Sequence, residues 1–166
     1  ENYDVVYGWP DMDMSGISQC VFTREFGEYV DDWYAHNNLN RASRSWGEKP
    51  MLTQAYSLAK TTEEMHTPGQ FIGGCQWHPF DHQRGYHPDP FYGAFRQKKT
   101  AYYMFESQRS DQPFVHIAHE MTQFSDADVT VFSNCDSVRL TTYQGAHTYT
   151  LPVLHPTAAA LNAPVG

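Results

Sequence analysis

Three short stretches of the chain place acidic, aromatic and histidine side chains directly after apolar runs. They begin at Tyr7, at Arg24 and at Trp77. An ionised carboxylate can attack the anomeric carbon of a sugar, with a second carboxyl group about 5–5.5 Å away when the configuration is retained. The indole of a tryptophan offers a flat apolar face to a sugar ring. These residue types therefore indicate carbohydrate chemistry.

Glu25 is the strongest candidate for the attacking carboxylate, because it lies just past the apolar run 17–22 and has Arg24 beside it. A nearby arginine keeps a carboxylate ionised, although alternation along a strand would point the two side chains to opposite faces. Trp77 suits the wall of a sugar site. The polar side chains after it suit sugar hydroxyls: Asp81, His82 and Arg84.

Each of these residues also has an ordinary structural interpretation. Glu25 could be a surface or capping acid, Trp77 could be a core residue, and residues 81–90 could form a polar loop with proline turns. Residues 24–32 could equally be the acidic start of a helix, favoured by the helix dipole. Only the occurrence of all three groups at successive strand ends favours the functional interpretation.

The elements that must position these groups are short strands and two helices. Strands are predicted over residues 4–9, 18–26 and 70–77, and the Gly73–Gly74 pair in the third suggests a close backbone approach. Helices are predicted over residues 49–66 and 92–108. This order is typical of parallel strands covered by helices, and enzymes of that class gather their catalytic groups at the carboxyl ends of the strands.

In the helix predicted over residues 49–66, Leu52, Tyr56 and Leu58–Ala59 are expected to share one apolar side, and Pro50 fits the first turn.

The pattern changes after residue 108. Short β-rich runs follow, separated by turns, and they predict an antiparallel sandwich. A boundary is expected near residues 110–113, where the chain is polar and reaches a proline. Three strands cannot close a barrel and about 55 residues hold too few strands for a sandwich, so we expect the chain to be part of something larger.

Composition argues against several other classes of protein. The net charge is −8, and no basic cluster exceeds the run Arg96–Lys99, which makes the chain a poor candidate for nucleic-acid binding. No apolar run approaches the roughly 20 residues that a membrane helix needs. Aromatic residues reach 15%, a level that suits a packed core or surfaces for sugars and protein partners.

The cysteines and histidines give little sign of a metal or disulfide site. Cys20, Cys75 and Cys135 are odd in number and widely spaced, so we expect three buried apolar residues. His116 and His119 lie in a run that alternates like a strand, which would put them on opposite faces. No metal or other cofactor is expected.

Four segments together resemble glycoside hydrolase family 2, in the order in which that family carries them. "FTREFGEYVDDW" resembles its strand-seven nucleophile segment, and "GGCQWHPFDHQRGY" its strand-eight segment. "GAFRQKKTAYYMFESQ" is similar to its last barrel helix. "DVTVFSNCDSVRL" is similar to a strand pair of the immunoglobulin-like domain that follows the barrel. Within the family, the segments resemble most the β-galactosidases of polysaccharide-degrading bacteria.

The resemblance implies an α/β fold with two parts. Residues 1–110 would be the C-terminal portion of a (β/α)8 TIM barrel, with strands six to eight, and residues 111–166 part of an immunoglobulin-like β-sandwich. Glu25 would be the nucleophile and Trp77 would line the sugar subsite, while residues 81–84 shape the pocket. "VYGWP" resembles the end of strand six, which makes Tyr7 and Trp9 wall residues.

The implied reaction is double displacement with retention by an exo-acting enzyme that releases β-linked galactose from oligosaccharides or polysaccharide fragments. The family's acid/base glutamate belongs to an Asn-Glu pair, and that pair does not occur here. It is therefore expected upstream of Glu1. Val6 occupies a place where some members carry a tyrosine.

Two alternatives stay open. The first keeps the family but changes the sugar, as in a β-glucuronidase or β-mannosidase, for which Arg84 and the run Arg96–Lys99 are candidate partners of a carboxylate. The second is a non-catalytic fragment that binds glycans or partners. The expected partners are a carbohydrate substrate and either the remainder of a parent chain or a second copy. The expected location is the periplasm or the cell surface of a bacterium.

Overall fold

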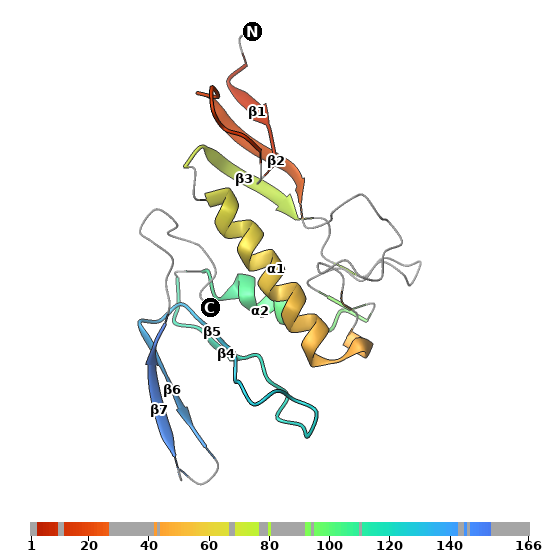
Figure 1. Cartoon of the computed structure of the whole chain (residues 1–166), viewed down its shortest axis with the longest axis vertical. Helices are drawn as coiled ribbons and strands as arrows, with labels where there is room; N and C mark the ends of the chain where they lie inside the picture. The colour runs from red at the N-terminus through yellow and green to blue at the C-terminus, as the bar shows by residue number, and fades with distance from the viewer. Residues whose placement is uncertain are drawn as a thin grey trace.

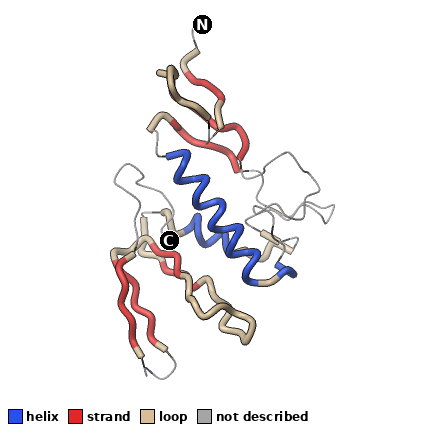
Figure 2. Tube along the Cα trace, viewed as in Figure 1, coloured by secondary structure: helices blue, strands red, loops and turns tan. Residues whose placement is uncertain are grey.

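The computed structural model describes residues 3–9, 12–26, 42, 44–66, 69–76, 80, 92–93, 95–109, 111–142, 145 and 147–153, with the backbone alone for residues 24–26, 45 and 66. These parts form a three-stranded sheet, two α-helices, a short 3₁₀ helix and two pairs of strands (Figure 1; Figure 2). All statements on structure below refer to these residues.

The three-stranded sheet is parallel throughout. It contains β1 (Val5–Tyr7), β2 (Cys20–Phe26) and β3 (Phe71–Gln76), in the spatial order β1-β2-β3. The three strands predicted from the sequence are confirmed, each shorter than expected by one or a few residues. In the described part of the connection between β1 and β2, residues 8–9 and 12–19, the chain forms no helix, which departs from a regular alternation of strand and helix.

Helix α1 (Glu48–His66) confirms the longer predicted helix and follows the 3₁₀ helix η2 (Arg44–Trp46). The predicted apolar side is confirmed for Leu58, which is fully buried, and for Leu52 and Ala59, which pack against the core. It is wrong for Tyr56, which is 45% exposed and bonds through its hydroxyl to Thr130 Oγ1 at 2.8 Å. The buried stripe includes two polar residues, so a count of apolar residues alone does not show its full helical period. Its members are Met51, Gln54, Ala55, Leu58, Thr62 and Met65.

Helix α2 (Thr100–Glu106) is much shorter than the predicted span of 92–108. The chain before it makes a turn, since Arg96 has a φ of 62° and the Gly93 N–H donates to the Gln97 carbonyl at 2.8 Å. Tyr92 and Lys98 then pair as an antiparallel bridge. A left-handed residue inside the span stops the helical ladder from forming earlier.

Two apolar cores share α1. Met65 packs with Val21 of β2 and Phe71 of β3, while Ala55 and Leu58 pack with Ala101 and Met104 of α2. Ala118 and Phe132, from the later β-rich segment, complete the second core. Figure 2 shows the long helix running between the sheet and the β-rich segment.

The later strands pair in antiparallel fashion, as the alternating pattern predicts for the segment after residue 108. Strand β4 (Val115–Ile117) pairs with β5 (Val131–Ser133), and β6 (Ser137–Thr141) pairs with β7 (Thr148–Pro152). Phe132 of β5 lies in the core shared with the helices, so apolar packing continues across residues 110–113. The sandwich and the domain boundary stay predictions.

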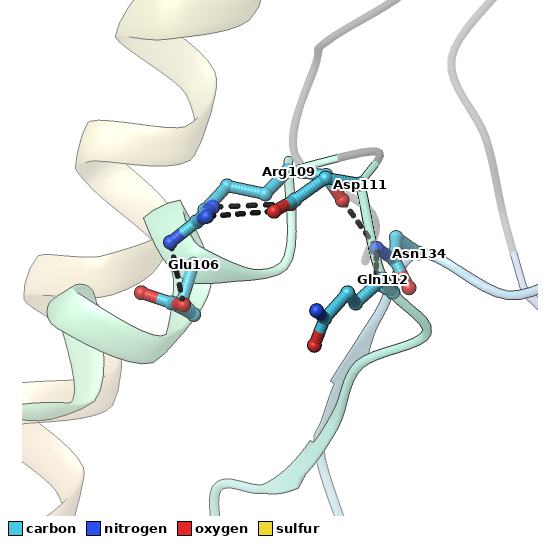
Figure 3. A network of polar contacts seen from close by, with 5 residues as sticks. All are labelled: Glu106, Arg109, Asp111, Gln112 and Asn134. Atoms are coloured by element: carbon cyan, nitrogen blue, oxygen red, sulfur yellow. Dashed lines mark hydrogen bonds and ion pairs between the residues drawn. The ribbon is translucent and has the colours of Figure 1, made fainter.

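A polar network ties the end of α2 to the turn after β5 (Figure 3). The Asn134 side chain accepts from the Phe114 N–H at 2.7 Å and donates to the carbonyls of Arg109 and of Gln112, the latter at 2.8 Å. Arg109 Nη2 lies 2.8 Å from Asp111 Oδ2, and this hydrogen bond holds the pKa of Asp111 below its usual value. One amide therefore bonds three backbone groups on residues 109–114.

The prediction for the cysteines is wrong. Cys20 and Cys75 are exposed, Cys135 is partly exposed, and none of the three forms a disulfide. Val21 of β2 packs against α1, and the neighbouring Cys20 belongs by alternation to the other face of the sheet. None of the described helices is long and apolar enough to cross a membrane.

Truncation of the fully buried Leu58 tests the shared role of α1. We expect Leu58→Ala to lower the free energy of unfolding by about 2–5 kcal/mol, because it removes a side chain from the core and leaves a cavity. The exposed Lys60, whose ion pair with Glu64 is weak at 3.8 Å, offers a control, and Lys60→Ala should change stability by less than about 0.5 kcal/mol. Urea denaturation followed by circular dichroism measures both, and similar effects for the two variants would contradict the packing described here.

Candidate functional site

Parallel pairing brings the carboxyl ends of β1, β2 and β3 to one edge of the sheet. Strand β2 is central, with β1 on one side and β3 on the other. Tyr7 ends β1, Glu25 is the next-to-last residue of β2, and Trp77 directly follows the end of β3. The three stretches singled out in the sequence therefore start from adjacent positions on a single edge.

Tyr7 and Trp9 form a partly exposed aromatic pair at the β1 end of this edge. Their ring centroids lie 5.2 Å apart with an interplanar angle of 66°, an edge-to-face arrangement. Their exposed fractions are 46% and 44%. Part of each residue is therefore accessible to a ligand.

The backbone around Glu25 departs from regular pairing. Thr23 pairs with Gly74, and Phe26 pairs with Gln76, so β2 uses three steps where β3 uses two. This register shift places one extra residue in β2, as a β-bulge does, and such bulges redirect side chains and are frequent beside active sites. Val21 packs on α1, and strict alternation would place residues 23 and 25 on that same face. The bulge interrupts this alternation between Thr23 and Phe26, the interval that contains Glu25.

The Gly8–Thr23 contact was missed by the sequence reasoning. Thr23 is fully buried, and its Oγ1 donates to the Gly8 carbonyl at 2.9 Å. A Cβ atom at Gly8 would lie 2.6 Å from Val21 Cγ1, so no larger residue fits there without movement. The signal available was a glycine inside an aromatic strand end, which often marks a close backbone approach. The approach predicted at Gly73 is looser, because a Cβ there would stand 3.7 Å from the Phe22 ring.

The predicted pocket loop follows β3 in the sequence, and most of it lies outside the described residues. Trp77, Asp81, His82 and Arg84 lie outside the described residues, and the Glu25 side chain does as well. Asp13, another acid near the β1 end, accepts hydrogen bonds from the Ser15 N–H at 2.9 Å and the Ser15 Oγ at 2.8 Å. These two bonds lower the pKa of Asp13 and commit it to a local turn.

The basic run 96–99 is engaged with the protein itself. The guanidinium of Arg96 lies 4.9 Å from the centroid of the Phe80 ring, and Lys98 Nζ lies 4.0 Å from that of Tyr102. Lys99 is fully buried and donates to the Ala42 carbonyl at 2.8 Å. These cations hold the turn before α2 in place.

A cleft of about 370 Å³ lies beside this run, between the start of α1, the start of α2 and strand β4. Its described lining includes Arg44, Glu48, Lys98, His116 and His119. Among the described residues, neither Tyr7 nor Trp9 lines it, while Lys98 and Lys99, from the run named for a uronic-acid carboxylate, do. The two histidines therefore line one cleft rather than opposite faces, because β4 ends at Ile117 and alternation does not continue to His119.

The two histidines differ in their bonding. His119 Nδ1 accepts from the Met121 N–H at 3.0 Å, and its Nε2 lies 2.8 Å from the Asp126 carbonyl, so this ring organises the loop after β4. His116 instead stacks on Tyr103 of α2, with centroids 3.7 Å apart and an interplanar angle of 11°. Burial lowers the pKa of His116 below its ordinary value of 6.5.

This pKa shift predicts that stability falls in mild acid. The unfolded chain binds a proton at His116 more readily than the folded chain, so the contribution of the neutral ring is complete above about pH 6.5 and is lost as the pH falls through the folded pKa. The described lining of the same cleft also carries the cations Arg44, Lys98 and Lys99 and the acids Glu48 and Glu120. His116→Phe keeps an aromatic ring that does not titrate.

We therefore expect the free energy of unfolding of the wild type to drop more steeply between about pH 7 and about pH 5 than that of His116→Phe. Urea titrations at several pH values measure the two slopes. Equal slopes would show that His116 does not contribute to the acid sensitivity.

The chain matches no model of a known protein family, and it matches none of the curated protein sequences with which it was compared. The function proposed below consequently depends on the residues of the chain, on their resemblance to a known hydrolase family and on the arrangement of the strands.

Proposed function

We propose that this chain belongs to a retaining, exo-acting glycoside hydrolase of family 2 that releases β-linked galactose from oligosaccharides or polysaccharide fragments. The observation that carries the proposal is the parallel order β1-β2-β3, with the central strand bearing Glu25. Parallel β/α enzymes collect their catalytic groups at this edge. In the order of the strands, the Tyr7–Trp9 pair belongs to the end of β1 and Trp77 follows β3, on either side of the strand that carries Glu25.

The proposed reaction has two steps. The Glu25 carboxylate forms a bond to the anomeric carbon while the bond from that carbon to the leaving oxygen breaks and a general acid protonates the leaving oxygen. The general acid of the first step, now deprotonated, then acts as a base and activates a water molecule. This water attacks the anomeric carbon and releases Glu25 and the sugar with retained configuration. The 166 residues contain no Asn-Glu pair, so we assign the acid/base to a residue outside this sequence.

A neutral sugar fits the described charges better than a uronic acid does. A uronic acid needs a cation for its carboxylate, and the candidates within 96–99 are engaged elsewhere: Arg96 with Phe80, Lys98 with Tyr102 and Lys99 with the Ala42 carbonyl. Tyr7 and Trp9, by contrast, keep exposed ring surface suited to the apolar face of a pyranose. Arg84, the other cation named for a uronic acid, lies outside the described residues, so the choice of galactose rests on the resemblance to β-galactosidases.

The proposed fold follows from the same strands. Strands β1, β2 and β3 would correspond to strands six to eight of a TIM barrel within residues 1–110, and residues 111–166 to part of an immunoglobulin-like domain. The parallel sheet and the antiparallel pairs support this assignment. A periplasmic or cell-surface location, a carbohydrate partner and chemistry without a cofactor belong to the same proposal.

Replacement of Glu25 tests the reaction directly. In a complete protein that contains this chain, Glu25→Gln should lower kcat on an activated aryl β-galactoside by at least about 10³-fold, because the amide cannot form the glycosyl ester. Glu28→Gln, three residues later in the same acidic stretch, is the matched control and should retain most activity. Release of the aryl alcohol, followed by absorbance, measures both.

Near-wild-type turnover by Glu25→Gln would refute the role of this residue. Parallel assays with aryl β-glucuronides and β-mannosides separate the sugars, and a preference for either would correct the substrate. If the complete protein cleaves no glycoside but binds glycans, a binding module replaces the enzyme. The 166-residue chain by itself is expected to be inactive, since its acid/base partner is assigned elsewhere.

A further inference from the structure

The buried hydroxyl of Thr23 makes a contact that the proposed reaction does not use. Thr23 lies in β2, two residues before Glu25, and its Oγ1 donates to the carbonyl of Gly8, which follows β1. The bond is 2.9 Å long, and Thr23 has no exposed surface. A buried carbonyl that loses its donor destabilises the fold locally, so this bond constrains how the two strand ends lie against one another.

The same junction is fixed from two other directions. The Gly8 N–H donates to the Phe22 carbonyl at 3.2 Å, so Gly8 bonds β2 through both its N–H and its carbonyl. The absence of a side chain at Gly8 permits the approach, because a Cβ would lie 2.6 Å from Val21 Cγ1 and 3.1 Å from Met12 Sδ. Close packing and two hydrogen bonds together set the spacing of β1 and β2 at this point.

The junction lies between the two groups whose relative position matters for the proposed reaction. On the β1 side, Gly8 stands between Tyr7 and Trp9, the aromatic pair. On the β2 side, Thr23 is the last residue in regular register with β3, opposite Gly74, before the bulge that contains Glu25. Thr23 is therefore the last paired residue of β2 before its second register shift, the first lying between Val21 and Phe22.

We propose that Thr23 is a positioning residue for the nucleophile: its hydroxyl, held on the Gly8 carbonyl, fixes where the β2 bulge begins and so sets the Glu25 backbone against the Tyr7–Trp9 pair. This inference rests on the proposed function, because it takes Glu25 as the nucleophile. Thr23 contacts no substrate and acts through the backbone. Misplacement of a reacting group by about 1 Å costs on the order of 10²-fold in rate, so a single anchoring bond can matter.

Three variants isolate the hydroxyl. Thr23→Val keeps the shape and removes the donor, while Thr23→Ser keeps the donor and removes a methyl group. Thr62→Val is the matched control on α1: Thr62 is also buried, at 5% exposed, and its Oγ1 donates to the Leu58 carbonyl at 2.8 Å. Thr62→Val removes the same kind of hydrogen bond, but at a position that is not on the edge of the sheet.

The experiment uses the complete protein and two readouts. One is kcat and KM on an aryl β-galactoside, and the other is the rate at which an activated 2-deoxy-2-fluoro-β-galactoside labels the protein, with the labelled residue located by peptide mass spectrometry. We expect wild type to be labelled at Glu25. Thr23→Val should be labelled about ten- to hundredfold more slowly and lose kcat to a similar extent, with KM changed by less than about threefold.

Rescue distinguishes positioning from general stability. Thr23→Ser and Thr62→Val should both remain within about threefold of the wild-type labelling rate, although each loses some stability. Labelling of Thr23→Val at the wild-type rate would overturn the inference and leave the proposed function intact. A folded Thr23→Ser as slow as Thr23→Val would also overturn it, because the hydroxyl would then not be the cause.

Two further outcomes are decisive. If the wild type is not labelled at Glu25, the proposed function fails and this inference fails with it, a result visible without any variant. If Thr23→Val does not fold, Thr23→Cys replaces it, since a thiol has similar bulk and is a weak donor. Thr23→Cys should then be slower than Thr23→Ser, and equal rates would overturn the inference.

Discussion

The buried stripe of α1 is shared between two cores, and the described structure depends on this sharing. Met65, near the end of the helix, packs on Val21 and Phe71 of the parallel sheet. Ala55 and Leu58, nearer its middle, pack on α2 and on Phe132 of β5. An isolated two-stranded unit such as β4-β5 is marginal, and three strands need a hydrophobic face or a packed helix for independent stability. Helix α1 therefore contributes to the stability of both the parallel sheet and the core formed with α2 and β5.

Strand β2 is held at its start and at its middle. At its start, the Val21 N–H donates to the Gln70 carbonyl at 2.8 Å, and Gln70 Nε2 donates to the Ile17 carbonyl at 2.5 Å. At its middle, Thr23 bonds the Gly8 carbonyl and so joins β2 to the end of β1. A group that must meet a substrate within tenths of an ångström is best carried on such a strand, since rigid elements hold geometry better than loops do.

Local pattern was enough to predict the three parallel strands and α1, because each is a run whose period or β-branched content is visible in a short window. The start of α2 was not visible, since it depends on the left-handed Arg96 and on the pairing of Tyr92 with Lys98. The apolar side of α1 was predicted only in part, because polar Gln54 and Thr62 lie in the buried stripe while Tyr56 is exposed. Exposure of Cys20 depends on which face of the sheet a helix covers, and no window of sequence contains that.

For the candidate site, the sequence pointed to the three strand ends, while their adjacency needed the sheet order. The bulge beside Glu25 is a mismatch between two strands that are 45 residues or more apart along the chain, so it has no local signature. Gly8 was the exception, since a glycine between Tyr7 and Trp9 was open to interpretation as a close approach.

The Asn134 network has a consequence for how the helical and later β-rich segments stay joined when conditions change. The carboxamide of Asn134 is neutral over the whole working range, and its three bonds go to backbone groups that do not titrate. The neighbouring pair of Arg109 with Asp111 is exposed, and dissolved ions screen it. At high and at low salt alike, the hydrogen bonds of Asn134 should keep the end of α2 and the turn after β5 in the same arrangement. The ion pair of Arg109 with Asp111, by contrast, should weaken as the salt concentration rises.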